Sequence, residues 1–181
     1  MKMIHTSEST EKSAAMQVAE LMSAAARTAP KACGIDLVET MVLDGEDKDR
    51  LTDAMRKIGA DSGKPFFIRD AGNVDACHLI VLIGAGVKAR GLNCGLCGVA
   101  DCSEAGKAGV ACAMSVNDLG IAVGSAAATA MDHRIDNRIL YTAGMAALKL
   151  KLFKEDIKIC FGIGLAIKGK NVFFDRPAIG K

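Results

Sequence analysis

The sequence predicts a single α+β domain over residues 1–181, in which helices alternate with strands and a cysteine-rich loop is inserted at residues 91–112. Three stretches carry this prediction. Residues 10–29 repeat small and apolar side chains every three or four positions, as an amphipathic helix does. Residues 157–168 alternate bulky apolar residues with small or polar ones, which is the period of a strand. Residues 75–84 contain a continuous apolar run of strand length, typical of a central strand.

The remaining elements of the first half follow from capping and turn signals. Pro30, followed by Gly34, ends the first helix. Residues 36–43 alternate as a partly buried strand, and a second helix over residues 46–58 follows an Asp-Gly turn. Residues 65–68 predict a short strand or a hydrophobic plug.

In the second half, a helix is expected over residues 108–123 and a joint of small residues over 124–129. Asp132 or Asp136 is then expected to cap another helix that runs to about residue 150, because aspartate is a favoured N-cap residue. Residues 171–176 predict one more short strand.

One face of the strand at residues 157–168 is nearly bare. Cys160, Gly162 and Gly164 alternate there with isoleucine and phenylalanine on the other face. Because glycine in a strand often marks the close approach of another backbone or of a ligand, we expect a flat group or a backbone segment against this face.

Composition excludes several classes of function. The net charge is only +2, without a basic run, which gives no support for nucleic-acid binding. No signal peptide is visible, and the longest apolar run, residues 77–86, is too short to span a bilayer, so we expect no membrane association and a cytoplasmic location. Seven cysteines in such a chain indicate metal or redox use rather than disulfides.

The cysteine loop, residues 91–112, carries the most specific pattern. Cys94, Cys97, Cys102 and Cys112 have the spacing C-x2-C-x4-C-x9-C, among several glycines. Two thiolates separated by two residues can hold one metal ion or cluster from a single turn, and glycines allow the left-handed backbone that such loops need. Thiolates are soft ligands, which limits the candidates to iron-sulfur, zinc or copper(I).

We favour an iron-sulfur cluster at these cysteines, of the 4Fe-4S type. A structural zinc site is the alternative metal, although zinc sites usually carry two close pairs of ligands and only Cys94 and Cys97 form one here. Free or redox-active thiols remain a third interpretation. Cys112 lies in an apolar run and is equally compatible with a small core residue. Cys77 is expected to be a buried thiol, and His78 a hydrogen-bonded core or edge histidine rather than a ligand.

Other patterns are weaker. Residues 84–89 mimic a dinucleotide-binding fingerprint, but a helix would have to open there and the cysteine loop follows instead. The polar stretch 132–138 is compatible with a site or with a capping loop. Since no nucleophile and base form a recognisable pair, the catalytic residues stay unassigned.

Four motifs together resemble a family of uncharacterised bacterial and archaeal proteins described as containing a ferredoxin domain (DUF2148). The motifs lie at residues 91–98, 118–125, 132–138 and 169–176, so the resemblance covers nearly the whole chain. The activity of that family is unassigned, and the resemblance implies a redox protein whose electron partner the sequence does not specify.

The chain is more distantly similar to the FMN-dependent nitroreductases, through residues 24–30, residues 119–125 and the closing strand. That resemblance implies a three-layer α/β/α fold with a central, mostly antiparallel sheet, a homodimer, and FMN at the subunit interface. The paired arginines that open nitroreductase chains are absent, which leaves Arg27, Lys170 and Arg176 as phosphate contacts. Cys33, just after the Ala-Pro corner, is a reserve cluster ligand or a thiol near the flavin.

Overall fold

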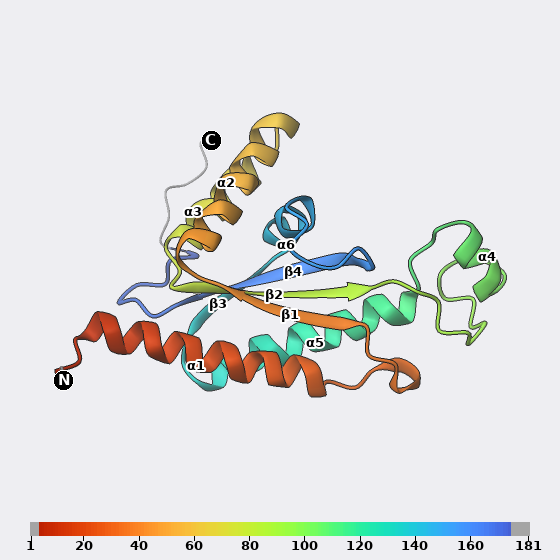
Figure 1. The fold of residues 1–181 in the computed structure, drawn as a ribbon, viewed down its shortest axis with the longest axis horizontal. Helices are drawn as coiled ribbons and strands as arrows, with labels where there is room; N and C mark the ends of the chain where they lie inside the picture. Colours follow the sequence, from red (N-terminus) through yellow and green to blue (C-terminus); the bar gives the residue numbers. More distant parts are fainter. Residues whose placement is uncertain (1–3, 175–181) are drawn as a thin grey trace.

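The computed structural model describes residues 4–174, which form a four-stranded antiparallel sheet covered by helices on both faces (Figure 1). The strand order is β1-β2-β4-β3. The strands are β1 (Val38–Leu43), β2 (Leu79–Gly86), β3 (Asp136–Leu140) and β4 (Ile157–Ala166). All three neighbouring pairs are antiparallel, so the predicted α+β class and the three-layer arrangement are confirmed.

Each face of the sheet has its own hydrophobic core. The helices on one face are α1 (Ser7–Thr28) and α5 (Ala113–Asp132). The helices on the other face are α2 (Gly45–Ser62), α3 (Pro65–Asp75) and α6 (Tyr141–Lys149). Met22 and Leu119 are fully buried in the first core, and Leu51 and Met55 are fully buried in the second. Every residue of β2 is buried between the two layers, as expected of a central strand.

Residues 65–68 belong to a helix, so the expectation of a strand or plug there is wrong. Pro65 occupies the first turn of α3, where its fixed φ suits a helix and its missing N–H is not needed. Phe67, Ala71 and Val74 recur at helical spacing and are buried, and Ala71 and Val74 belong to the second core. A run of four apolar residues does not separate strand from helix, and the longer period decides.

The small residues at 124–129 continue α5 and do not form a joint. They let α5 pack closely on α1, and the Ser125 hydroxyl donates a hydrogen bond of 3.3 Å to the Ala25 carbonyl. The next helix, α6, begins only at Tyr141, because residues 136–140 form β3 at the edge of the sheet. The predicted helix cap at Asp132 or Asp136 is therefore wrong.

The bare face of β4 meets the backbone of α6, as the sequence predicted. A Cβ atom placed on Gly144 of α6 would lie 1.8 Å from the Cys160 carbonyl oxygen, so only glycine allows this contact. One placed on Gly162 would lie 2.8 Å from the Ala143 Cβ. Ile157 departs from the predicted alternation and joins the second core, because the β2–β4 register shifts at residues 85–86.

Two of the weaker sequence motifs, at residues 171–174 and 84–86, have structures that differ from the predicted ones. Residues 171–174 form a turn where a strand was predicted, and the rest of that segment lies outside the described residues. Residues 84–86 are the end of β2, and no helix opens after them, unlike in a dinucleotide-binding fold. In the described part of the chain no helix is both long and apolar enough to cross a membrane.

Candidate functional site

The cysteine loop leaves the sheet after β2, projects from one end of the molecule and returns at the start of α5 (Figure 1). It contains one short helix, α4 (Cys102–Lys107), capped by the Asp101 carboxylate, which accepts a hydrogen bond of 2.9 Å from the Glu104 amide. Gly91, Gly95 and Gly98 have φ values of 76°, 70° and 80°. These left-handed conformations explain the glycines of the motif.

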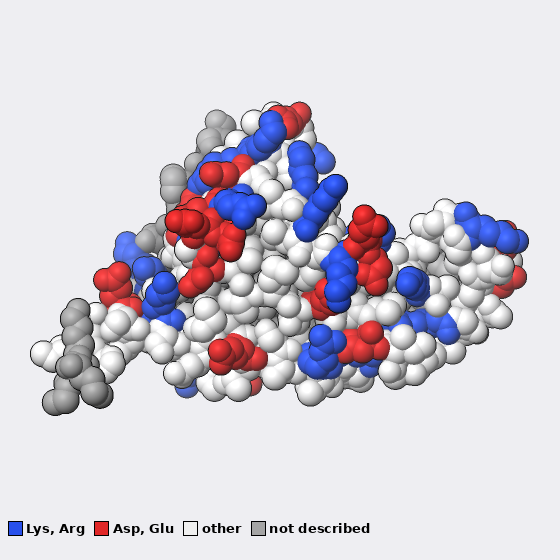
Figure 2. Space-filling view, viewed as in Figure 1, with Lys and Arg blue, Asp and Glu red and all other residues white. Residues whose placement is uncertain are grey.

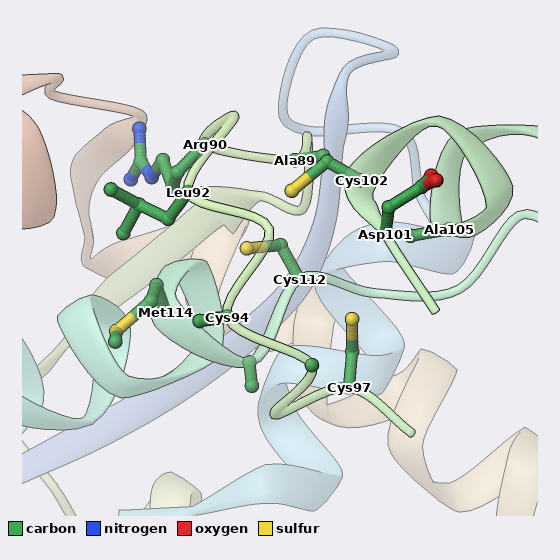
Figure 3. Close-up of a pocket in the computed structure, with 12 residues that line it drawn as sticks. Ala89, Arg90, Leu92, Cys94, Cys97, Asp101, Cys102, Ala105, Cys112 and Met114 are labelled. Carbon is green, nitrogen blue, oxygen red and sulfur yellow. The ribbon is translucent and has the colours of Figure 1, made fainter. Parts of the chain in front are cut away.

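Four cysteines line one small pocket, which we call the cysteine pocket (Figure 3). Its lining residues are Ala89, Arg90, Leu92, Cys94, Gly95, Cys97, Asp101, Cys102, Ala105, Cys112, Ala113 and Met114. In the view of Figure 3, the Cys102 side chain extends toward Cys112, and the Cys97 side chain reaches toward the same space from the other side. The predicted ligands thus come together from two segments, the loop and the start of α5.

Two hydrogen bonds between Cys102 and Asn93, each from a backbone amide to a side chain, orient Cys102. The Asn93 side-chain oxygen accepts from the Cys102 amide at 2.9 Å, and the Asn93 amide lies 3.4 Å from the Cys102 sulfur. Amide donors of this kind stabilise a thiolate and tune the reduction potential of a cluster that it ligates. The sequence analysis did not predict a role for Asn93, although its position next to Cys94 could have indicated that it belongs to the site.

Cys112 is the N-cap residue of α5 and is buried. Its amide donates to the Val87 carbonyl at 3.0 Å, which brings the two ends of the cysteine loop together. Burial raises the pKa of the Cys112 thiol, but hydrogen bonds from backbone amides outweigh it and the pKa lies below its ordinary value. The amides belong to Ser115, Arg90 and Met114.

Among residues 4–174, no three Cys, His, Asp or Glu side chains come close enough together to hold a single metal ion. The four thiols border the cysteine pocket without converging on one point. A 4Fe-4S cluster takes one thiolate on each iron, so its ligands surround a larger core than the ligands of one zinc ion do. The chemistry of the donor set, four thiols that border one pocket, fits a cluster.

A buried ion pair joins the loop to the helical layer. Arg90 and Asp118 lie 2.7 Å apart, with side chains only 2% and 3% exposed. Asp118 also accepts a hydrogen bond of 3.0 Å from the Ala32 amide, while Nε and Nη1 of Arg90 have no partner in the described chain. Sequence analysis missed this pair, because its two members are distant in sequence and each is unremarkable alone.

The other three cysteines lie outside the cysteine pocket. Cys33 is exposed on the turn after α1, with a φ of 57°. Cys77 and Cys160 are buried in the body of the molecule, and burial raises the pKa of each thiol to about 12. The Cys77 sulfur donates to the Asn73 carbonyl at 3.2 Å, so its role as a core residue agrees with expectation.

A second cavity, the arginine pocket, lies where α3, the end of β3 and the start of α6 meet. Its volume is about 410 Å³. It is lined by Phe66, Arg69, Asp70, Asn73, Arg138, Ile139, Leu140 and Tyr141. Cavities of this size that combine apolar walls with a few convergent polar groups are typical small-molecule sites.

The walls of the arginine pocket are aromatic and its charge is positive. The rings of Phe66 and Tyr141 have centroids 6.0 Å apart. The buried Asp70 carboxylate accepts from the Thr142 hydroxyl at 2.9 Å and pairs with Arg69 at 2.8 Å. The Arg138 guanidinium lies 5.2 Å from the centre of the exposed Phe174 ring and has no ion pair within residues 4–174.

The arginine pocket does not contain the residues that the sequence offered for a flavin phosphate. Arg27 pairs with Asp36 at 2.5 Å and donates to the Val38 carbonyl at 2.8 Å, which ties the end of α1 to β1. Neither Arg27 nor Lys170 lines this pocket, and Arg176 lies outside the described residues. Their assignment to a flavin stays a prediction.

Comparison with known proteins gives one matching family and one relative in sequence. Residues 108–176 match the family of uncharacterized proteins containing a ferredoxin domain (DUF2148), a segment that includes Cys112 and follows the other pocket cysteines. An uncharacterized protein of Archaeoglobus fulgidus is 41% identical over 165 residues, which cover 86% of this chain and 88% of the relative.

Solved structures share the fold at low identity. A nitroreductase with bound FMN from Desulfitobacterium hafniense has a TM-score of 0.58 and 12% identity, with 94% of this chain and 82% of that chain covered. The nitroreductase CinD from Lactococcus lactis, in complex with nicotinic acid, has a TM-score of 0.58 and 15% identity, with coverages of 99% and 85%. The FMN-dependent NfnB of Mycobacterium smegmatis, in complex with NADPH, gives 0.57 and 11%, with coverages of 87% and 81%. These similarities show a nitroreductase-like fold.

Proposed function

This chain belongs to the family of uncharacterized proteins containing a ferredoxin domain, and we propose that it is an iron-sulfur protein that transfers electrons. Cys94, Cys97, Cys102 and Cys112 would ligate a 4Fe-4S cluster. The cluster would supply one-electron chemistry, and the chain would hold it, donate hydrogen bonds to its sulfurs and control its contact with solvent.

The observation that supports this proposal is the common pocket of the four cysteines. Three of them lie within nine residues, but Cys112 comes from the start of α5 and still borders the same space. The lowered pKa of the Cys112 thiol also favours the thiolate form, which is the form that binds iron. A buried core cysteine such as Cys160 has the opposite shift.

The first experiment measures iron and acid-labile sulfide in protein purified anaerobically from iron-replete cells. We expect iron and sulfide in near-equal amounts, with visible charge-transfer absorption that bleaches on reduction. Equimolar zinc that survives dialysis, with no iron, would replace the proposal by a structural zinc site. Neither metal would leave thiol chemistry as the role of the loop.

Single cysteine variants identify the ligands. Cys97→Ser, Cys102→Ser and Cys112→Ser should each lose iron. Cys33→Ser is the matched control, because the Cys33 thiol is exposed and lies outside the cysteine pocket. If Cys33→Ser lost iron and Cys112→Ser kept it, Cys33 would be the fourth ligand.

A second candidate function is that of an FMN-dependent oxidoreductase, and the arginine pocket favours it. The aromatic pair Phe66 and Tyr141 suits a flat ring, and Arg69 and Arg138 suit a phosphate. Bound FMN would supply one- and two-electron redox chemistry, while Asp70 would hold Arg69 in place.

Titration of the purified protein with FMN, followed by the quenching of flavin fluorescence, tests this second function. Arg138→Met should weaken binding, whereas Arg50→Met should not, since Arg50 pairs with Asp47 on the exposed surface of α2. The same titration on Arg27→Met tests the contact predicted from sequence. No binding at micromolar protein would reject the FMN proposal.

A homodimer is the assembly that we propose. The outer faces of α1 and α5 expose Leu21, Val116, Ile121 and Met131, each at least 39% accessible. Exposed apolar residues on adjacent helices are common at subunit interfaces. Light scattering after size exclusion should give twice the mass of one chain, and a monomer at micromolar concentration would contradict this proposal.

A further inference from the structure

A third cavity lies against the outer side of the cysteine loop, and we call it the lysine groove. Its volume is about 660 Å³, and it is bounded by α4 and the loop on one side and by the start of β4 on the other. Its lining residues are Val87, Lys88, Ala89, Ala105, Gly106, Gly109, Val110, Ala111, Asp156, Lys158 and Ile159. Figure 2 shows the surface hollowed between the body and the projecting α4 lobe.

Most residues that line the lysine groove are apolar. Val87, Val110 and Ile159 supply its larger side chains, and the remaining apolar positions are alanine or glycine. A Cβ added at Gly106 would meet no atom within 4 Å, so this glycine faces open space. Flat apolar ring systems fit floors of this kind, and the volume lies within the range of small-molecule sites.

The rim of the lysine groove is positively charged. Lys88 and Lys158 line it, and neither forms an ion pair with any residue of the described chain. Asp156 is the one acidic residue in the lining. Two unpaired ammonium groups against one carboxylate favour a ligand that carries negative charge.

The lysine groove and the cysteine pocket share a wall. Ala89 and Ala105 line both cavities, so a ligand in the groove would be separated from the thiols by small side chains and backbone. We propose that the groove binds an anionic molecule with a flat apolar ring, the electron donor or acceptor of the cluster. This role rests on the proposed function. As an acceptor, the ring would gain the one electron that the reduced cluster loses.

Two fluorescent probes test the groove without knowledge of the natural ligand. Anilinonaphthalene sulfonate carries a flat ring and one negative charge, and N-phenyl-1-naphthylamine is its neutral analogue. We expect both to bind the full-length protein, with or without metal. Lys88→Gln/Lys158→Gln should weaken sulfonate binding about tenfold and leave the neutral probe unchanged. Equal weakening of both probes would remove the charge argument.

Gly106→Leu fills the lysine groove from within helix α4, where leucine is a better helix former than glycine. It should abolish binding of both probes. Gly120→Leu is the matched control, because Gly120 is also helical with open space around it but lies outside the groove. Unchanged probe binding in Gly106→Leu would overturn the groove as the site.

Quenching of probe fluorescence tests whether the lysine groove lies next to the cluster site. Probe bound to iron-loaded protein should be strongly quenched relative to probe bound to metal-free protein, because the cluster absorbs visible light nearby. Equal fluorescence in the two forms would overturn the link between groove and cluster. Failure to load iron rejects the cluster proposal, while the probe titrations of metal-free protein still decide the groove.

Discussion

Cysteine and glycine are concentrated in two regions of this molecule, the cysteine loop and the contact between α6 and β4, and they serve opposite purposes there. Glycines of the loop, such as Gly95 and Gly98, have positive φ values and no atom within 4 Å of a Cβ position. Gly144 and Gly162 have no room for a Cβ. In the loop the backbone conformation requires glycine, and in the core the packing does.

The thiols of the two regions differ in the same way. Cys160, on β4, is surrounded by apolar side chains, and its burial raises the pKa to about 12. Burial also raises the pKa of the Cys112 thiol, but hydrogen bonds from the backbone amides of Ser115, Arg90 and Met114 lower it further than burial raises it. The Cys160 thiol is more deeply buried and receives one such hydrogen bond, from Ile83, so the two thiols differ in both burial and hydrogen bonding.

The largest effect is expected at the core glycine. Gly144→Ala would place a methyl group against the Cys160 carbonyl and should lower the free energy of unfolding by at least about 3 kcal/mol, measured by urea unfolding. Gly120→Ala, in the open part of α5, should be neutral or stabilising by up to about 1 kcal/mol. A Gly144→Ala variant as stable as the parent would break the distinction between packed and open glycines.

The stability of the protein should depend on the buried ion pair between Arg90 and Asp118, next to the cysteine loop. Arg90→Met leaves the Asp118 carboxylate buried without a cation and should destabilise the metal-free protein by about 3 kcal/mol. Adding Asp118→Leu should recover part of this loss, because the unpaired charge is then removed, although the Ala32 amide still lacks its acceptor. Urea unfolding of the three variants measures the coupling, and simple additivity would contradict it.

The buried thiols of Cys77 and Cys160 should make the stability of the protein fall at alkaline pH. Unfolded thiols release their protons above about pH 9, whereas Cys77 and Cys160 hold theirs until about pH 12 in the folded protein. Their contribution to stability is therefore complete below about pH 9 and falls as the pH rises toward 12, by about 1 kcal/mol each at about pH 10. Cys77→Ala/Cys160→Ala should show a smaller decline of the urea midpoint from about pH 8 to about pH 10.

The smallest effect concerns Arg27. Burial raises the pKa of Asp36, but the Arg27 hydrogen bond helps to hold the pKa below its ordinary value of 3.8. Both side chains are partly exposed, so Arg27→Met should cost less than about 1 kcal/mol at neutral pH. The stabilisation is present above the ordinary pKa and is lost as the pH falls, so parent and variant should converge in acid. A gap that persists in acid would mean that Arg27 acts through packing.

Sequence patterns predicted the fold best where one period runs for many residues. The amphipathic α1 and the alternation along β4 are examples, and both lie as expected. The predictions failed where short segments depend on distant partners. Residues 136–140 become β3 only by pairing with β4, and residues 65–68 become helical only as part of a longer buried face. Local propensity does not contain that information.

In the candidate site, too, residues close in sequence were predicted and residues brought together by distant elements were not. The short spacing of Cys94, Cys97 and Cys102 predicted that they share one site, because residues close in sequence are close in space. Arg90 pairs with Asp118 from a separate element, and Arg69 and Arg138 line one pocket from α3 and β3, so these groupings follow only from the topology. The assignment of the four cysteines as ligands stays a prediction until metal is measured.

The hydrogen bond from the Cys112 amide to the Val87 carbonyl has an evolutionary consequence. It joins the two ends of the cysteine loop, so the chain leaves β2 and enters α5 at nearly one point. Because the cost of closing a loop grows slowly with its length, a segment attached in this way can be gained, exchanged or trimmed while the strands and helices beneath it keep their places. We therefore expect that the cysteine loop could be replaced as one unit without a change in the strands and helices beneath it.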